Sequence, residues 1–498
     1  MRLQFAFVAL FCLSVIVRIP YINQPLCGNY QRLTAHTLIT QEIWATDGII
    51  EHHFLPVYTY PDSTNHNIMI GDLGSVEKNG RYYYISYPSF GFVLPYLATL
   101  GYSYIPIVLK IFNIFLHFLA ALFLWKILQF YFQSLAAFIT VAFFIFQPNL
   151  LWFHTNVYFL DILSMDLLII QLYLTHRYLL SPHLKNAIYW LLTNFLLCQT
   201  EWIGYLVLLV VGLYFLYQKK YVAFWVIAAS GILNLGFTFW QFGSYLGYEN
   251  YFNALTQKGL KRIGNSEAVS HHWGEWRPLL FFIINFLIYE FTFIMAYFFN
   301  VGNLLAQMDI LKKINFSIYS KLLILSGIPV LLHYFILFNF TTGHSVLASV
   351  IANPFLTFLL APMLEVLVKT PNELGKKIGI SMNIILLVMG IVFYFLRSNT
   401  DFQQYFKVHF ANFQFTPTNE FEILGNYVKK ITPKGYTACI LTPELHLNPQ
   451  IMYYSKKNIV VAFTPEEVVH YAKNKKVKLK VYKINEYWKV IEEYEVLP

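Results

Sequence analysis

The sequence contains a series of apolar runs, each long enough to cross a lipid bilayer. Crossing about 30 Å of hydrocarbon takes a helix of roughly 17 to 25 mostly apolar residues, and only helices or closed barrels satisfy their backbone hydrogen bonds there. Hydrophobic residues make up 57% of the 498 residues and charged residues only 12%, a balance far from that of a soluble globular protein. We predict an α-helical polytopic membrane protein with about eleven spans, near residues 3–20, 104–128, 135–153, 157–176, 186–200, 202–218, 222–242, 278–300, 321–340, 345–368 and 379–396.

The basic residues between these runs support this order of spans. Connections on the cytoplasmic side of a membrane are enriched in Lys and Arg. Alternate connections here carry them, at Arg2, Lys126, Arg177, Lys185, Lys219, Lys220, Lys312, Lys313, Lys369, Lys376 and Lys377. The connections near 153–157, 199–201 and 341–345 carry none. With the N-terminus inside, the long loops 21–103 and 243–277 and the C-terminal residues 397–498 are predicted to lie outside the cytoplasm.

The net basic charge does not indicate a nucleic-acid-binding protein. The 35 Lys and Arg outnumber the 26 Asp and Glu, but they occur in short clusters between apolar runs and form no continuous basic stripe. The partners expected from composition are therefore the lipid bilayer and molecules that reach its surface, and no nucleic acid.

The chain is predicted to form two domains, a transmembrane domain over 1–396 and an extracytoplasmic α/β domain over 397–498. In the second part, residues 419–431 favour a helix, and 437–442, 458–463 and 477–484 favour strands. Thr464-Pro-Glu-Glu is a typical helix start, with a capping hydroxyl, Pro in the first turn and Glu467 completing a capping box. No phosphate-binding glycine loop accompanies the strands, so we expect no nucleotide site there.

The first outer loop is too long to be only a connector. Residues 34–46 are predicted to form helices lying in the membrane interface. Further along, Tyr83, Tyr84 and Tyr87 lie in an aromatic run, Gly80-Arg-Tyr-Tyr-Tyr-Ile-Ser-Tyr-Pro. Tyrosines of this kind suit either an interfacial aromatic belt or a surface on which a sugar ring stacks.

Ionisable residues predicted near the outer ends of spans are candidates for chemistry, because such groups are costly in a membrane. Asp161 lies about one turn into the fourth span, and Glu201 lies at the next outer helix end. His344 occupies the outer turn between the ninth and tenth spans. Each has a structural alternative: Asp161 in an ion pair with a neighbouring helix, Glu201 stabilised by a helix N-terminus, and His344 as a hydrogen-bonded surface residue.

Basic residues in the outer loops could neutralise a phosphate group at the membrane surface. Arg32 offers this in the first loop, and Arg262 and Arg277 in and beside the second. Lipid headgroups alone would also explain them. Neither loop has a metal-ligand spacing, so no metal site is predicted, and any requirement for a divalent metal or another cofactor is left open.

These features resemble the C-type glycosyltransferase superfamily, which includes mannosyltransferases and aminoarabinose transferases. The resemblance rests on the first span ending in Arg18-Ile-Pro, the long loop with its Tyr and Pro run, and Leu332-His-Tyr-Phe through Gly343-His344 followed by Ala352-Asn-Pro. The family usually places an acid early in the first loop. Here Gly28-Asn-Tyr-Gln-Arg has none and resembles a variant in which Gln31 and Arg32 take those positions.

The resemblance implies an enzyme that moves a sugar from a polyprenyl-phosphate donor to an extracytoplasmic lipid, glycan or protein. In that scheme Arg32, Arg262 or Arg277 would hold the phosphate, Asp161 or Glu201 would supply the base, Tyr83, Tyr84 and Tyr87 would line the sugar site, and His344 would orient donor or acceptor. A transporter or flippase, and a noncatalytic scaffold with the same fold, are the alternatives. The chain ends without an endoplasmic-reticulum retention signal, so we expect a multi-pass protein of a bacterial inner membrane.

Overall fold

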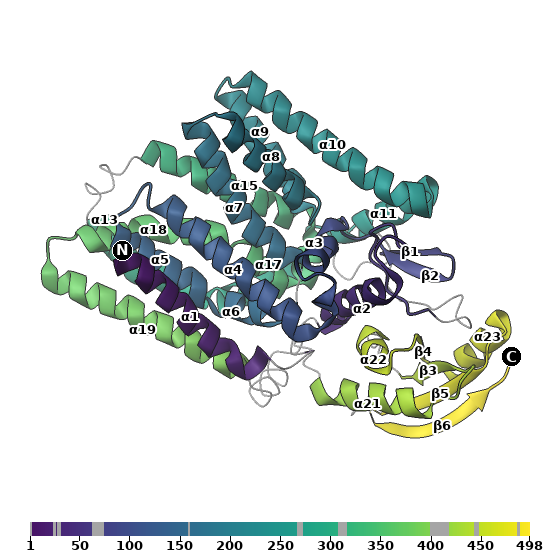
Figure 1. Ribbon diagram of the computed structural model, residues 1–498. Helices are drawn as coiled ribbons and strands as arrows, with labels where there is room; N and C mark the ends of the chain where they lie inside the picture. Colours follow the sequence, from purple (N-terminus) through teal and green to yellow (C-terminus); the bar gives the residue numbers. More distant parts are fainter. Residues whose placement is uncertain are drawn as a thin grey trace. The chain divides into compact units, whose positions relative to one another are not determined.

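The computed structural model describes residues 2–22, 26, 31–61, 74–157, 160–265, 272–306, 316–398, 418–442, 448–485 and 489–498. The chain divides into two compact units (Figure 1). The membrane unit comprises residues 1–22, 110–240 and 256–397, and the second unit comprises 23–109, 241–255 and 398–498. The second unit thus gathers segments of the three stretches that the charge pattern assigns to one side of the bilayer.

The membrane unit is built from helices, several of which lie roughly parallel (Figure 1). α4 and α10 also extend into the second unit, as does α11. The helices are α1 (Arg2–Ile22), α4 (Pro106–Leu128), α5 (Ser134–Phe146), α6 (Pro148–Thr155), α7 (Leu160–Leu180), α8 (Leu184–Cys198), α9 (Ile203–Tyr217), α10 (Tyr221–Leu246), α11 (Tyr248–Ile263), α12 (Trp276–Tyr289), α13 (Phe291–Ala306), α15 (Phe316–Ile336), α16 (Phe338–Gly343), α17 (Ser345–Ile351), α18 (Asn353–Lys369) and α19 (Glu373–Ser398).

Within the described residues, five single helices are long and apolar enough to cross a membrane. The number rises to eight if each of three bent helix pairs counts as one span. The predicted polytopic helical fold is confirmed, and every predicted run coincides with one helix or with two consecutive helices. The count of about eleven stays a prediction, because α7, α8 and α9 are not among these eight.

Three of the predicted continuous spans are broken. α5 and α6 meet at 53°, α12 and α13 at 75°, and α17 and α18 at 50°. Pro148 and Pro354 lie in the first turns of α6 and α18, where a missing backbone N–H leaves no helical hydrogen bond unmade. Proline therefore begins two of the second segments, whereas the third break occurs at Glu290, without proline.

A proline inside α18 shows how the membrane unit satisfies its backbone. Pro362 has no N–H to donate to the carbonyl of Phe358, four residues earlier. The hydroxyl of Tyr319 in α15 donates to that carbonyl instead. Because no water replaces a lost hydrogen bond in hydrocarbon, this contact from a neighbouring helix makes the proline tolerable.

The second unit combines the first outer loop with the C-terminal region. Its C-terminal sheet has the order β4-β3-β5-β6, with β3 parallel to both neighbours and β6 antiparallel to β5. The elements are α2 (Gln31–Asp47), the β1 (Ser75–Lys78) and β2 (Arg81–Tyr84) hairpin, α3 (Phe90–Ala98), the 3-10 helix η1 (Tyr102–Tyr104), α21 (Thr418–Ile431), β3 (Thr437–Leu441), α22 (Asn448–Ser455), β4 (Ile459–Ala462), α23 (Pro465–Lys475), β5 (Leu479–Ile484) and β6 (Val490–Val496).

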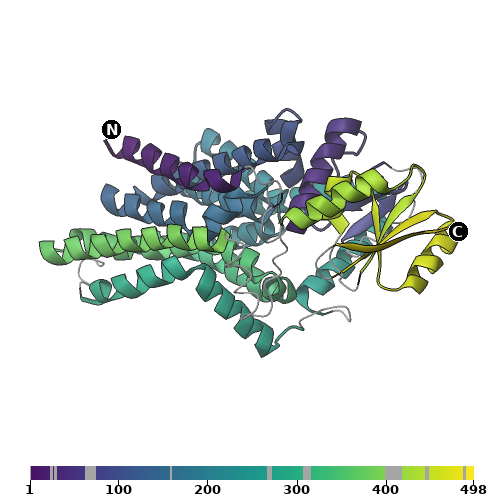
Figure 2. The same ribbon diagram turned by 90° about the horizontal axis from the view of Figure 1, so that it is seen from below.

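The predicted helix and three strands of the C-terminal region are confirmed as α21, β3, β4 and β5. Alternation along β5 divides the sheet into two faces: Val481 packs with the α23 core residue Val468, and Tyr482 contacts Thr432 beside α21, with their hydroxyls 2.8 Å apart. Figure 2 shows α21 and α23 on opposite sides of the sheet. The predicted cap is also present, because the Glu467 N–H donates to Thr464 Oγ1 at 3.3 Å.

The helix predicted over 34–46 is present as α2, but its surroundings differ from the prediction. An interfacial helix would expose one polar face, whereas residues 34–41 are all buried. The physical reason is coverage by neighbours in the same unit: α22, η1 and α3 all pack against α2. α2 is therefore a core helix of the second unit.

Candidate functional site

Asp161 and Glu201 are both buried in the membrane unit, with exposures of 2% and 1%. Asp161 lies in the first turn of α7, and Glu201 lies in the short turn between α8 and α9. The Glu201 carboxylate accepts a hydrogen bond from the Ile203 N–H, so it caps α9, as its structural alternative predicted. The turn is tight, because a Cβ on Gly204 would lie 2.7 Å from the backbone nitrogen of Cys198.

The two carboxylates are close enough for their charges to interact. The pKa of Glu201 is raised to about 7, mainly by burial and in addition by the negative charge of Asp161. The hydrogen bond from Ile203 and the positive charge of Arg262 act in the opposite direction. A carboxyl group with a pKa near the working pH is suited to accept and release a proton.

Arg262 is held in place by the way α11 ends. The N–H of Gly264 donates to the Lys261 carbonyl at 3.1 Å, and the N–H of Asn265 donates to the Leu260 carbonyl at 2.9 Å. These are the two hydrogen bonds of a Schellman motif, and Gly264 has the positive φ of 88° that the motif requires. Arg262 therefore lies in the last helical turn, where a cation is favoured by the helix dipole, and its exposure is only 8%.

Three basic side chains surround the ring of Phe340 in α16. The Arg262 guanidinium lies 5.2 Å from the ring centroid, and the rings of His333 and His344 lie 5.8 and 5.0 Å from it. The Asn339 side-chain amide donates to the Lys261 carbonyl at 2.8 Å, which fastens α16 to the end of α11. The structure thus places Arg262 and His344 near the same aromatic ring. His344 is exposed, as its structural alternative predicted.

His333 is a site residue that the sequence analysis missed. It is fully buried in α15, its ring centroid lies 5.8 Å from that of Phe340, and neither ring nitrogen has a hydrogen-bond partner among the residues that the structure describes. Its position inside an apolar run concealed it. The available signal was that a histidine within a span is itself a costly polar group.

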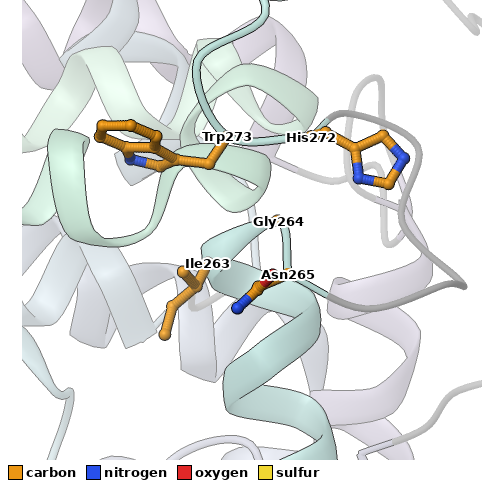
Figure 3. Close-up of a pocket in the computed structure, with 5 residues that line it drawn as sticks. All are labelled: Ile263, Gly264, Asn265, His272 and Trp273. Carbon is orange, nitrogen blue, oxygen red and sulfur yellow. The ribbon is translucent and has the colours of Figure 1, made fainter.

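A cavity of about 440 Å³ opens beyond the end of α11 (Figure 3). Ile263, Gly264 and Asn265 line it from the helix end, and His272 and Trp273 line it from the following segment. The indole N–H of Trp273 donates to the Phe335 carbonyl at 3.1 Å, which fixes the ring. The cavity thus begins one residue after Arg262.

The other predicted phosphate ligands are not part of this cluster of contacts. Arg277 is exposed in the first turn of α12, with its guanidinium 5.6 Å from the Trp276 ring centroid. Gln31 and Arg32 lie in the first turn of α2, in the second unit, and their side chains fall outside the described part of the chain.

The three predicted sugar-site tyrosines are buried in the second unit. Tyr84 stacks on Tyr58 at 4.7 Å between centroids, and Tyr87 lies 5.9 Å from Tyr84. The Tyr83 and Tyr245 hydroxyls are 3.0 Å apart. These rings pack on other aromatic side chains of their own unit, so their role at a sugar site stays a prediction.

A second set of ionisable groups in the membrane unit was also missed. Arg18 Nη2 lies 2.7 Å from His117 Nδ1, and the His117 ring stacks on His154 at 4.1 Å between centroids. His154 Nε2 in turn lies 3.1 Å from an oxygen of Asp166. All four are buried. Arg18 and Asp166 are charges within apolar runs, and the histidines that link them come from α4 and α6.

Comparison with known proteins identifies the fold. No family model and no curated protein sequence matches the chain. Among solved structures, ArnT from Cupriavidus metallidurans bound to undecaprenyl phosphate matches with a TM-score of 0.51 at 10% identity, over 97% of this chain and 94% of that one. The same protein in the apo state gives a TM-score of 0.52 at 10% identity, over 98% and 94%.

An oligosaccharyltransferase from Archaeoglobus fulgidus, tethered to an acceptor peptide, matches with a TM-score of 0.54 at 11% identity, over 96% of this chain and 69% of that one. Both proteins are C-type glycosyltransferases. The chain therefore has the fold of this superfamily, as the sequence resemblance predicted, and it is an integral multi-pass membrane protein.

Proposed function

We propose that this protein is a membrane glycosyltransferase that moves a sugar from a polyprenyl-phosphate donor to an extracytoplasmic acceptor. The observation that carries the proposal is one cluster in which the acids Asp161 and Glu201 and the basic residues Arg262 and His333 are buried. His344 completes its basic end from an exposed position. Acid and base at opposite ends of a site suit a reaction in which a phosphate leaves as a proton is removed.

Arg262 and His344 would bind the donor phosphate. The reaction develops negative charge on the phosphate oxygen as the bond to the sugar breaks, so a fixed cation there lowers the barrier. A guanidinium is suited to this task because it presents two parallel N–H donors to two oxygens. Arg32 from the first loop is proposed as a further ligand, on the family resemblance.

A carboxylate of the Asp161 and Glu201 pair would remove the proton of the acceptor. The acceptor atom attacks the anomeric carbon from the face opposite the phosphate, and the bond between that carbon and the phosphate oxygen breaks with its electron pair. The acceptor proton passes to the carboxylate, and the configuration at the anomeric carbon inverts. We assign the base to Asp161 and the coupled, proton-exchanging partner to Glu201.

The test separates phosphate binding from proton removal. Asp161→Asn should keep the affinity for undecaprenyl phosphate, measured by native mass spectrometry, and lower sugar transfer from polyprenyl-phosphate sugars by at least about 100-fold, the range of a lost general base. Arg262→Met, which keeps an unbranched side chain but removes the guanidinium and its charge, should instead weaken undecaprenyl-phosphate binding.

Glu249→Gln is the control, because Glu249 is an exposed acid in the first turn of α11. It should leave binding and transfer unchanged. Wild-type transfer by Asp161→Asn would remove Asp161 from the base position, and unchanged phosphate binding by Arg262→Met would remove Arg262 from the phosphate site.

The bent helix pairs give the transporter or flippase alternative its own support, because discontinuous helices are common in transporters. At the break beside Glu290, however, the carboxylate is bound by side-chain amide donors of the protein itself. Movement of a fluorescent polyprenyl phosphate across proteoliposomes, with no transfer to any acceptor, would favour the alternative. The sidedness and the bacterial inner membrane remain part of the proposal.

A further inference from the structure

The three broken helices of the membrane unit meet at one carboxylate. Glu290 separates α12 from α13 and is fully buried. Gln147, at the break between α5 and α6, donates its side-chain amide to Glu290 Oε2 at 2.6 Å. Asn149 in α6 and Asn353 at the start of α18 donate to Oε1 at 3.1 and 3.3 Å. Residues from all three breaks therefore bind the same side chain.

The three amide contacts of Glu290 suit an ionised carboxylate, because each amide nitrogen donates to one of its oxygens. Among the described residues no Lys, Arg or His pairs with it, and the three partners present amide nitrogens. The orientation of two of these amides is fixed independently: Gln147 Nε2 also donates to the Tyr289 carbonyl at 3.0 Å, and Asn353 Nδ2 to the Val350 carbonyl at 3.0 Å. Glu290 also immediately precedes α13, where the positive end of a helix dipole favours an anion.

Two side-chain contacts hold the ends of α17, the short helix that follows His344. At the start of α17, the side-chain amide of Asn285 in α12 donates to Ser345 Oγ at 2.9 Å. At its end, Asn149 donates to Ser349 Oγ at 2.8 Å while also binding Glu290. Glu290 is therefore linked through Asn149 to one end of α17, the helix that has His344 at its N-cap.

We infer that Glu290 is a positioning residue, whose negative charge fixes the three helix breaks and thereby holds His344 and Phe340 beside Arg262. The inference rests on the proposed function for its link to phosphate binding. A structural part stands by itself: the charge sets the angle between α12 and α13. Glu290 itself touches no substrate in this scheme and acts only through α17.

Glu290→Gln tests the inference with nearly unchanged shape. The carboxylate accepts hydrogen bonds on both oxygens, whereas a glutamine would turn an NH₂ group toward one of the amide donors. We expect the distance between spin labels at two exposed positions, 280 in α12 and 298 in α13, to become more broadly distributed. Binding of undecaprenyl phosphate should weaken about tenfold.

The double variant Glu290→Gln with Asn149→Asp is the decisive control. It returns one carboxylate to the junction, opposite a glutamine that can donate to it, so it should recover both the narrow distance distribution and the affinity. Asn149→Asp alone puts two acids 3.1 Å apart and should broaden the distribution. If Glu290 only filled space, returning a negative charge at position 149 would not restore the distance distribution or the affinity.

The outcomes distinguish this inference from the proposed function. An unchanged distribution in Glu290→Gln, or no recovery in the double variant, overturns the role of the charge. A distribution that broadens and recovers while the affinity stays constant overturns the link to His344. If the wild-type protein does not bind undecaprenyl phosphate, the proposed function fails, and the spin-label distances alone decide the role of Glu290.

Discussion

The ion pairs of the two units differ in how far they are exposed to water. In the membrane unit, the His154 and Asp166 side chains pair at exposures of 0% and 1%. In the second unit, Lys456 pairs with Glu42 at 2.6 Å, with side-chain exposures of 35% and 23%. One pair has lost its water entirely, and the other has kept part of it. The same type of interaction is therefore expected to have different energetic consequences in the two places.

The difference arises from what replaces the interaction when it is broken. Water solvates a half-exposed Lys or Glu that loses its partner, so exposed and half-exposed pairs contribute little. A buried carboxylate that loses its partner has no such substitute and costs several kcal/mol. Removing one partner from the buried pair should therefore be far more damaging than removing one from the half-exposed pair.

His154→Phe should give the largest effect. The phenyl ring keeps the stacking contact with His117 but leaves Asp166 buried without its partner, at a cost of about 3 to 5 kcal/mol. The measurement is unfolding of the purified protein in detergent by titration with sodium dodecyl sulfate. The double variant with Asp166→Leu removes both polar groups and should recover most of the loss, because apolar side chains often replace a buried pair without cost.

An equal loss in the single and double variants would contradict this explanation. It would mean that packing around His154 matters and that the unpaired carboxylate does not. The contrast between the two units would then arise from shape alone.

The raised pKa of Glu201 predicts that the stability of the protein depends on pH. The effect should be somewhat smaller than the loss expected from His154→Phe. Burial raises its pKa from 4.5 to about 7 in the folded protein. Between these values the unfolded chain has released the proton that the folded protein retains, so stability falls as pH rises through this window and is constant above it. The difference corresponds to about 3 kcal/mol at most.

Glu201→Gln should remove this part of the pH dependence. The measurement is the unfolding midpoint of wild type and variant at pH values between 4.5 and 8. As the pH rises, the midpoint of the wild type should fall relative to that of the variant. Glu249→Gln, at an exposed position, is the matched control and should follow the wild type. A constant difference across the range would show that Glu201 does not titrate in this window.

Much of the fold could be predicted from the sequence. The length of an apolar run indicates a membrane-spanning helix, and basic residues in alternate connections indicate the order of the spans. Three strands of the C-terminal sheet were also predicted, β5 from its period-two pattern and β3 and β4 from short apolar runs, whereas β6 was missed. The helix breaks were not predicted. An apolar run has the same hydropathy whether its helix is straight or bent by 75°, and no proline indicates the break at Glu290.

The site was predicted in part for a related reason. Asp161, Glu201, Arg262 and His344 are polar groups near the ends of apolar runs, so each was visible individually. The grouping of Arg262 with His344 depends on Phe340, an apolar residue among 47 phenylalanines, which no local pattern distinguishes. The burial of α2 was missed because α22, which covers it, lies some 400 residues away in the chain.

The pair between Lys456 and Glu42 should give the smallest effect of the three. Glu42 also accepts a hydrogen bond from the Tyr60 hydroxyl at 2.7 Å, and the side chain of Asn458 binds the backbone N–H and carbonyl of Tyr60 at 2.9 Å each. These remain in Lys456→Met, so the loss is expected to be about 1 kcal/mol or less. Amide hydrogen exchange of α2 and α22 in the full chain should rise no more than about fivefold.

Lys483→Met provides the matched control in the same unit. Lys483 pairs with Glu492 at 3.2 Å across the β5 and β6 strands, where both side chains are about half exposed. Its replacement should leave exchange in α2 unchanged, because no hydrogen bond or ion pair links that pair to the described residues of the first loop. A loss from Lys456→Met as large as that from His154→Phe would abolish the distinction between the units. Partial exposure would then fail to explain why one ion pair is expendable and the other is not.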